Sequence, residues 1–226
     1  MSEVFIIDAI RTPIGSFLGQ YKKTESVDLG SLCVEGIFSR NKNLNKKHVE
    51  GLILGQVLTA GLGMNTARQV LLKSKLSQNS FAYCVNQVCG SGMRAVMETA
   101  LKIKSNENQL LVAGGQESMS LARHTSLQRV TTKLGHEMMI DSILSEGLTD
   151  VFSKDHMGIT AENVARRYKV TRLEQDEFAF HSYKKAYNAL KKNYFKNELI
   201  SGSLVDEVRQ GTKLEKLSSL KAVFKK

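Results

Sequence analysis

Short apolar runs and stretches of helical spacing alternate along the first part of the chain. The apolar runs of strand length are residues 4–7, 51–58, 81–85 and 110–113. Apolar residues at helical spacing fill the segments between them, at residues 27–40, 66–75 and 93–104. Strands that alternate with helices predict an α/β domain with a mixed, mainly parallel sheet over residues 1–120.

The pattern changes after residue 120, where loops and helices replace the strand signals. Thr171 and Glu174 fit a capping box, in which each side chain bonds the backbone of the other residue. A helix is therefore predicted from there to about Lys192. The chain closes with one short strand-like piece after Leu204 and a final helix from about Leu214. We expect residues 121–226 to form a mostly helical subdomain.

Composition places the chain among ordinary soluble proteins. Hydrophobic residues make up 42% and charged residues 24% of the sequence. No apolar run reaches the roughly 18 residues that a membrane span needs. The N-terminal MSEVFIID has no basic region of the kind that opens a secretory signal. These features predict a cytoplasmic protein without a membrane partner.

The formal net charge is +10 and the isoelectric point is about 9.5. A nucleic-acid partner is one explanation of this charge. The lysines are dispersed, however, and the chain has no Trp and no basic strip interleaved with aromatic residues. A lysine-rich solvated surface explains the charge without nucleic acid, and its diffuse positive field also favours an anionic ligand.

The chain has three cysteines, Cys33, Cys84 and Cys89. They form neither a disulfide framework nor a CxxC pair for zinc, so no metal site is expected. Cys84 lies inside an expected strand and Cys33 on the apolar face of an expected helix, so both are interpreted as core residues. Cys89 differs from both because it lies between a strand and a helix.

The residues after Cys89 are Gly90-Ser91-Gly92, which suit a tight turn into a helix. The first N–H groups of a helix are unpaired and carry partial positive charge, which stabilises a thiolate, the nucleophilic form of cysteine. The same N–H groups are candidates for holding an oxyanion. The alternative is that Cys89 is a small buried hydrophobe, as many free cysteines are.

Cys89, with Asn86 before it and Gly90-Ser91-Gly92 after it, resembles the nucleophile motif of the thiolases, the acetyl-CoA C-acetyltransferases. Further stretches resemble the family in the same order along the chain, at residues 11–15, 55–69, 113–120, 156–163 and 174–179. The resemblance implies the N-terminal α/β domain of a thiolase, followed by most of its helical loop domain. It also implies an acyltransferase in which Cys89 accepts an acyl group from a coenzyme A thioester.

The resemblance extends to ligands and partners. It implies that His156 and Met157 lie near the pantetheine and acyl group of the substrate. Acetyl-CoA, acetoacetyl-CoA and free coenzyme A are the implied substrates, with no permanently bound cofactor. The segment from Arg123 to His136 resembles the loop that thiolase tetramers use for assembly, which implies a homo-oligomer.

Three features of the family are not found in the 226 residues: a Gly-His-Pro motif, an Asn-Glu-Ala-Phe motif and a second reactive cysteine. Thiolases bring a Gly-His-Pro histidine and a second cysteine from their C-terminal half, but this chain contains one proline, Pro13, and no cysteine after Cys89. We expect a truncated N-terminal half that is weakly active or inactive alone, or that pairs with a separate C-terminal half. The alternative function is a non-catalytic remnant or assembly module with the thiolase half-fold. A ketoacyl synthase is a third reading, which Glu117-Ser118-Met119 and His156-Met157-Gly158 fit less well.

Overall fold

A parallel three-stranded sheet lies at the centre of the α/β part of the protein, between its helices. The computed structural model describes residues 3–127, 129, 134–200, 202 and 204–224. The strand order is β2-β1-β3, with β1 at Gly51–Gly55, β2 at Phe81–Val85 and β3 at Leu111–Gly115. All three strands run parallel, in register from Gly51 beside Phe81 and Leu111.

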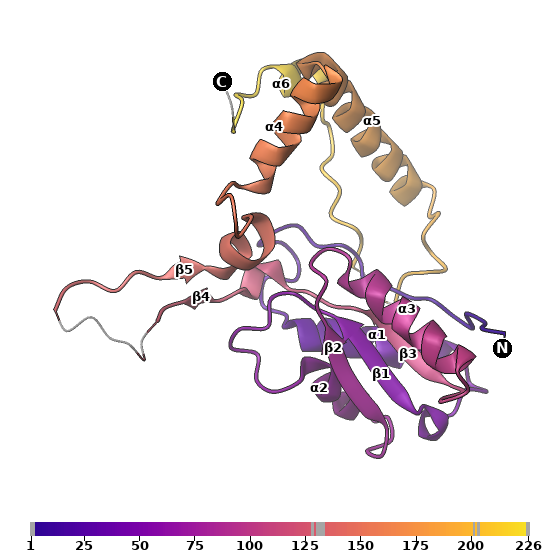
Figure 1. The fold of residues 1–226 in the computed structure, drawn as a ribbon. Helices are drawn as coiled ribbons and strands as arrows, with labels where there is room; N and C mark the ends of the chain where they lie inside the picture. Colours follow the sequence, from indigo (N-terminus) through magenta and orange to yellow (C-terminus); the bar gives the residue numbers. More distant parts are fainter. Residues whose placement is uncertain (1–2, 128, 130–133, 201, 203, 225–226) are drawn as a thin grey trace.

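Helices cover both faces of this sheet (Figure 1). Two of them, α1 (Ser26–Arg40) and α2 (Thr66–Lys73), lie together on one face, and α3 (Ser91–Lys104) packs across all three strands on the other. Short 3-10 helices, Lys46–His48 and Met119–Leu121, occur in the connections. The sheet is therefore the middle layer of an α/β/α arrangement, as the alternating pattern predicts.

The core lies between the sheet and the α1–α2 layer. Every residue of β1 is buried, which fits its place as the central strand. The side chains that share this core are apolar and come from β1, α1, α2 and the segments beside them: Val27, Val34, Phe38, Val49, Leu52, Leu54, Ala67, Val70, Leu71 and Leu76. Helical spacing on α1 and α2 thus reflects packing against the sheet.

The strand predicted at residues 4–7 is wrong. Residues 3–10 form no strand, and Phe5 and Ile6 are 74% and 81% exposed. The backbone first pairs at Arg11, which forms an isolated bridge with Leu199. An apolar run becomes a strand only where a neighbour accepts its backbone hydrogen bonds, and none of the described strands lies beside this run.

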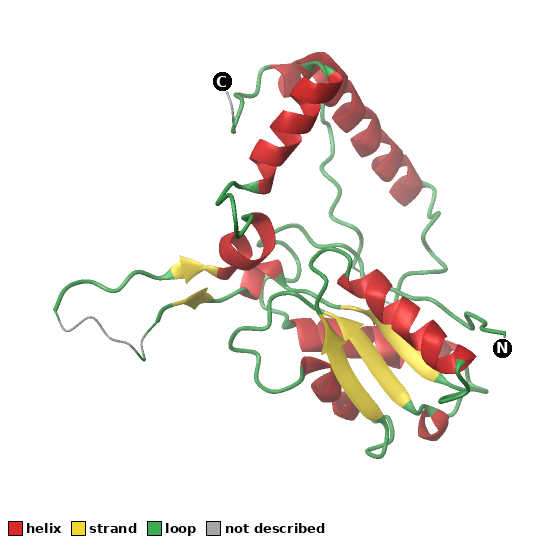
Figure 2. Ribbon diagram, in the orientation of Figure 1, coloured by secondary structure: helices red, strands yellow, loops and turns green. Residues whose placement is uncertain are grey.

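Residues beyond the sheet form a hairpin and a helical arm. The hairpin pairs β4 (His124–Thr125) with β5 (Ile140–Asp141), and a π-helical turn, Ile143–Leu148, follows it. The arm contains α4 (Met157–Tyr168), α5 (Arg172–Lys191) and α6 (Leu214–Ser218), which stand away from the sheet (Figure 2).

The helices predicted in this second part agree with the structure. The capping box of Thr171 and Glu174 opens α5 as predicted. The prediction of a strand-like piece after Leu204 is wrong, because residues 204–210 form no strand. The domain boundary at residue 120 stays a prediction. The expected assembly segment, residues 123–136, lies partly outside the described residues.

No helix in the described part of the chain has the length and apolar character needed to cross a membrane.

Candidate active site

Cys89 lies in the turn between β2 and α3, as predicted. The strand ends at Val85, Gly90 is the N-cap of α3, and the helix begins at Ser91. The Cys89 side chain is exposed, which excludes the alternative that it is a buried hydrophobe. The sequence pattern therefore places the thiol at the exposed start of a helix.

The turn holds an unusual backbone conformation directly before Cys89. Val88 has a φ of +48°, in the left-handed region that β-branched residues rarely adopt. The Val88 N–H donates to Asn86 Oδ1 at 2.9 Å, and the Val88 carbonyl accepts from Ser91 Oγ at 2.6 Å. Ser91 Oγ also accepts from the Gln87 N–H at 2.8 Å. Asn86 and Ser91 thus stabilise the strained turn that presents Cys89.

Glycines let α3 begin close to the sheet. A Cβ on Gly55, at the end of β1, would lie 2.3 Å from the Ser91 carbonyl carbon. A Cβ on Gly115, at the end of β3, would lie 3.3 Å from the Gly92 Cα. Any side chain at Gly55 would push the helix away, so this glycine fixes the position of the turn relative to the carboxyl edge of the sheet.

The turn uses some of the N–H groups that the sequence offers to an oxyanion. The Gly90 N–H donates to the Gln87 carbonyl at 3.0 Å, and the Ser91 N–H donates to the Val88 carbonyl at 3.1 Å. These two groups close the turn and are not free for a ligand, and the expectation that N–H groups at the helix start hold an oxyanion stays a prediction. Among the described residues, no side chain forms a hydrogen bond with the Cys89 thiol.

The other two cysteines are half-buried and have structural surroundings. Cys84 packs against the core, and its Sγ lies 3.1 Å from Thr66 Oγ1, which donates to Gln56 in a buried polar network. Burial raises the pKa of the Cys33 thiol. Both thiols are thus less suited than Cys89 to act as nucleophiles. Within the described ranges, no cluster of three His, Cys, Asp or Glu residues is arranged to hold a metal ion.

His156 and Met157 lie at the start of α4, on the helical arm. His156 is the N-cap, and its Nδ1 accepts a hydrogen bond from the Gly158 N–H at 3.0 Å. Met157 is 50% exposed. No hydrogen bond in the described part of the chain joins either residue to Cys89. The roles predicted for these two residues therefore stay predictions.

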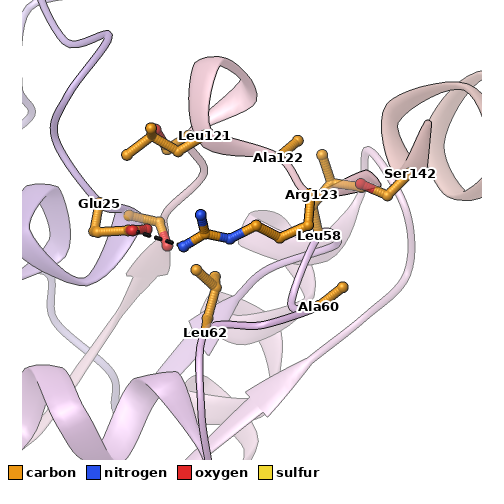
Figure 3. A pocket seen from close by; sticks show the side chains of 10 residues that line it. Glu25, Leu58, Ala60, Leu62, Leu121, Ala122, Arg123 and Ser142 are labelled. Atoms are coloured by element: carbon orange, nitrogen blue, oxygen red, sulfur yellow. Dashed lines mark hydrogen bonds and ion pairs between the residues drawn. The ribbon is translucent and has the colours of Figure 1, made fainter. Parts of the chain in front are cut away.

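A small cavity lies between the start of α1 and the β4–β5 hairpin (Figure 3). Arg123 crosses it and pairs with Glu25, with 2.9 Å between Nη2 and the carboxylate oxygen. The volume of the cavity is about 10 Å³, which leaves room for roughly one water molecule. Cys89 does not line this cavity, and the cavity is too small for an acyl thioester. We therefore interpret the Arg123–Glu25 ion pair as a structural contact between the hairpin and the sheet domain.

The comparisons with known proteins agree with this geometry. The family model described as "Thiolase, N-terminal domain" matches residues 4–226. The chain belongs to the thiolase family. Relatives of this thiolase chain include acetyl-CoA acetyltransferases of Paracoccus denitrificans, 39% identical over 237 residues, and of Rhizobium meliloti (strain 1021), 41% identical over 234 residues. A probable acetyl-CoA acyltransferase of Staphylococcus aureus (strain COL) is 40% identical over 239 residues.

These alignments cover 99–100% of this thiolase chain but 59–61% of each relative, so the chain spans about 60% of their length. A similar solved structure is the Acat5 thiolase of Ascaris suum in complex with coenzyme A. It has a TM-score of 0.90 and 33% sequence identity, and the match covers 96% of this chain and 57% of that one. The predicted thiolase-like α/β fold is therefore confirmed.

Sequence reasoning missed two residues that contact the candidate segments, Ser91 in the Cys89 turn and Phe224 beside His156. The role of Ser91 in holding Val88 was not predicted, although a serine at the first position of a helix is a recognised local hydrogen-bonding residue. Phe224 stacks on His156, with ring centroids 4.9 Å apart. No sequence signal links two residues so far apart in the chain, so only the tertiary structure reveals this contact.

Proposed function

We propose that this chain supplies the nucleophile of a thiolase-type acyl transfer, with Cys89 as the catalytic residue. The observation that carries the proposal is an exposed thiol in a strained strand–turn–helix at the carboxyl edge of the sheet. The Cys89 thiol gives its proton to solvent, and the thiolate Sγ attacks the carbonyl carbon of a coenzyme A thioester. The bond from that carbon to the coenzyme A sulfur breaks, coenzyme A leaves as a thiolate that takes up a proton, and the acyl group stays on Sγ.

The substrates that we propose are acetyl-CoA and acetoacetyl-CoA, with His156 and Met157 beside the pantetheine and acyl group. The Ascaris suum thiolase with the similar fold binds coenzyme A, which supports this class of ligand. Met157 is a half-exposed thioether, which suits contact with an apolar chain. The formal charge of +10 suits a phosphate-bearing ligand.

A complete catalytic cycle of the thiolase type uses motifs that these 226 residues do not contain. The acyl group must leave Cys89 again, and condensation also requires a base that removes a carbon-bound proton. The resemblance assigns these steps to a Gly-His-Pro histidine and a second cysteine, and Pro13 is the one proline of this sequence. We propose that a C-terminal thiolase half supplies them, and that homo-oligomerisation involves the hairpin segment.

Mass spectrometry of the purified chain after incubation with acetyl-CoA tests the nucleophile. We expect one acetyl adduct that maps to Cys89 and is released by hydroxylamine, because the adduct is a thioester. Cys89→Ala should abolish it, whereas Cys84→Ala, the matched control, should retain it. An absent adduct in the unsubstituted chain, or an adduct that persists in Cys89→Ala, would contradict the proposal.

A thiolysis assay of the same chain tests whether a C-terminal half is needed. Turnover of acetoacetyl-CoA should be far below that of a full-length thiolase, although the acetyl adduct forms from acetyl-CoA. Turnover comparable to the full-length enzyme, abolished by Cys89→Ala, would show that these residues suffice for the whole cycle.

A further inference from the structure

The first turn of α4 uses an imidazole ring as its cap. His156 has the extended backbone of an N-cap residue, with φ −66° and ψ 141°. Its Nδ1 accepts from the Gly158 N–H at 3.0 Å, and its carbonyl accepts from the Ile159 N–H at 2.8 Å. Nδ1 therefore takes the place of the side-chain oxygen that usually caps a helix.

This hydrogen bond decides which ring nitrogen carries the proton. A neutral imidazole has one donor nitrogen and one acceptor nitrogen, and a protonated ring has two donors and no acceptor. Because Nδ1 accepts from Gly158, the proton of the neutral ring is on Nε2. His156 thus offers Nε2–H as a donor and has no lone pair left to act as a base.

Phe224 fixes the plane of the same ring. Its ring stacks on His156 with centroids 4.9 Å apart and an interplanar angle of 23°. A Cβ built on Gly158 would lie 2.3 Å from two atoms of the Phe224 ring. Gly158 therefore has two functions, since its N–H binds Nδ1 and its lack of a side chain leaves room for Phe224.

We infer that Phe224 is a positioning residue that holds His156 in the Nε2–H tautomer, so that His156 donates a hydrogen bond to an acceptor oxygen of the acyl thioester. The ligand part of this inference rests on the proposed function. The tautomer part rests on the contacts of His156 with Gly158 and Phe224 alone. In this arrangement His156 is a hydrogen-bond donor to substrate and not a general base.

Long-range proton–nitrogen NMR spectra of the ¹⁵N-labelled full chain at alkaline pH test the tautomer. His156→Gln identifies the His156 signals by their loss. We expect Nε2 to be protonated and Nδ1 to show the shift of an acceptor. A protonated Nδ1 would overturn the inference.

Phe224 variants test the positioning role in the same spectra. Phe224→Ala should give averaged nitrogen shifts and about fivefold faster hydrogen exchange at the Gly158 amide, the factor expected when one ordinary hydrogen bond is lost. Phe224→Tyr should restore the values of the unsubstituted chain, because it keeps the ring. Gly158→Ala should act like Phe224→Ala by displacing the ring. Phe152→Ala, the control, removes a 92% exposed ring and should change nothing. Unchanged His156 shifts in Phe224→Ala would also overturn the inference.

Titration with acetoacetyl-CoA separates this inference from the proposed function. If the ligand binds, the Nε2–H signal of the unsubstituted chain should shift, and binding without that shift would overturn the donor role. If no binding occurs, the proposed function fails for this chain, while the tautomer and the Phe224 effect are still decided by the spectra without ligand.

Discussion

At the scale of single residues, the candidate site depends on how Val88 is held in a left-handed conformation. Such a backbone costs a β-branched residue on the order of 1–3 kcal/mol, and it persists only where neighbours compensate. Ser91 is 4% exposed and bonds both Gln87 and Val88. One buried hydroxyl therefore stabilises the turn that presents Cys89.

Replacement of Ser91 by alanine should lower the free energy of unfolding by about 1–3 kcal/mol. The Gln87 N–H loses its acceptor in a part-buried position, and the strained turn loses a support. Urea denaturation of both chains measures the change. Ser39→Ala is the control, because the exposed Ser39 hydroxyl donates to one carbonyl within its own helix. This substitution should change the free energy of unfolding by less than about 0.5 kcal/mol. Equal losses in the two variants would contradict this role for Ser91.

The three cysteines should differ in their reaction with iodoacetamide. Cys89 is exposed at a helix start, whereas burial raises the pKa of Cys33, and Cys84 contacts Thr66. We expect Cys89 to be alkylated at least about tenfold faster than the other two at pH 7.5. Peptide mapping over time measures the rates, and in urea they should converge. A Cys89 that reacts no faster than Cys33 would favour the non-catalytic assembly module.

At the scale of elements, an ion-pair network connects the N-terminal segment to the chain that returns from the helical arm. Arg11 binds Asp206 through Nη1 at 2.7 Å and Nη2 at 3.0 Å, and it also pairs with Glu198. Asp206 accepts from the Ile14 N–H as well. These hydrogen bonds, chiefly those from Arg11, lower the pKa of Asp206. The network explains why segments distant in sequence lie together without a shared strand.

Substitution of Asp206 by asparagine should destabilise the chain by about 3 kcal/mol at neutral pH, because Arg11 loses a carboxylate that is 9% exposed. The folded pKa of Asp206 lies below the unfolded value of about 3.9. The stabilisation is therefore complete above that value and is lost as the pH falls through the folded pKa.

Urea denaturation at pH 7 and at pH 3 measures this pH dependence. The difference between Asp206→Asn and the unsubstituted chain should shrink at the lower pH. Asp155→Asn, at an exposed position, should change stability by less than about 0.5 kcal/mol. If the difference in unfolding free energy between Asp206→Asn and the unsubstituted chain were the same at both pH values, the charge of Asp206 would not contribute to stability.

At the scale of the whole molecule, α3 covers the sheet with one face and exposes apolar side chains on another. Met93, Met97 and Leu101 are 67%, 51% and 59% exposed. They recur at intervals of four residues, so they form one stripe along the helix. Stripes of this kind are typical of protein contact surfaces, and they promote self-association when nothing covers them.

Replacement of both Met97 and Leu101 by lysine in one double variant should therefore reduce self-association of the chain. Dynamic light scattering across a concentration series measures it, with binding of a hydrophobic dye as a second readout. Phe152→Lys removes a single exposed ring outside the stripe and should have little effect. Association that is unchanged in the double variant would exclude the stripe as its cause.

The sequence by itself determined the elements whose signals are local. The β2 strand at Phe81–Val85 agrees with the prediction residue for residue, and Thr171 and Glu174 form the predicted capping box. The strand–Cys–glycine–helix order also placed Cys89 at an exposed helix start. Each of these depends on neighbours within a few residues, which periodicity and capping chemistry describe.

Only the tertiary structure decided the features that need a distant partner. The apolar run at residues 4–7 reads as a strand, but none of the described strands pairs with it. Arg11 with Asp206, and His156 with Phe224, come together across long stretches of chain. A backbone or side-chain polar group forms its hydrogen bonds with the groups that the fold places beside it. The local sequence pattern does not specify which distant residue that neighbour is.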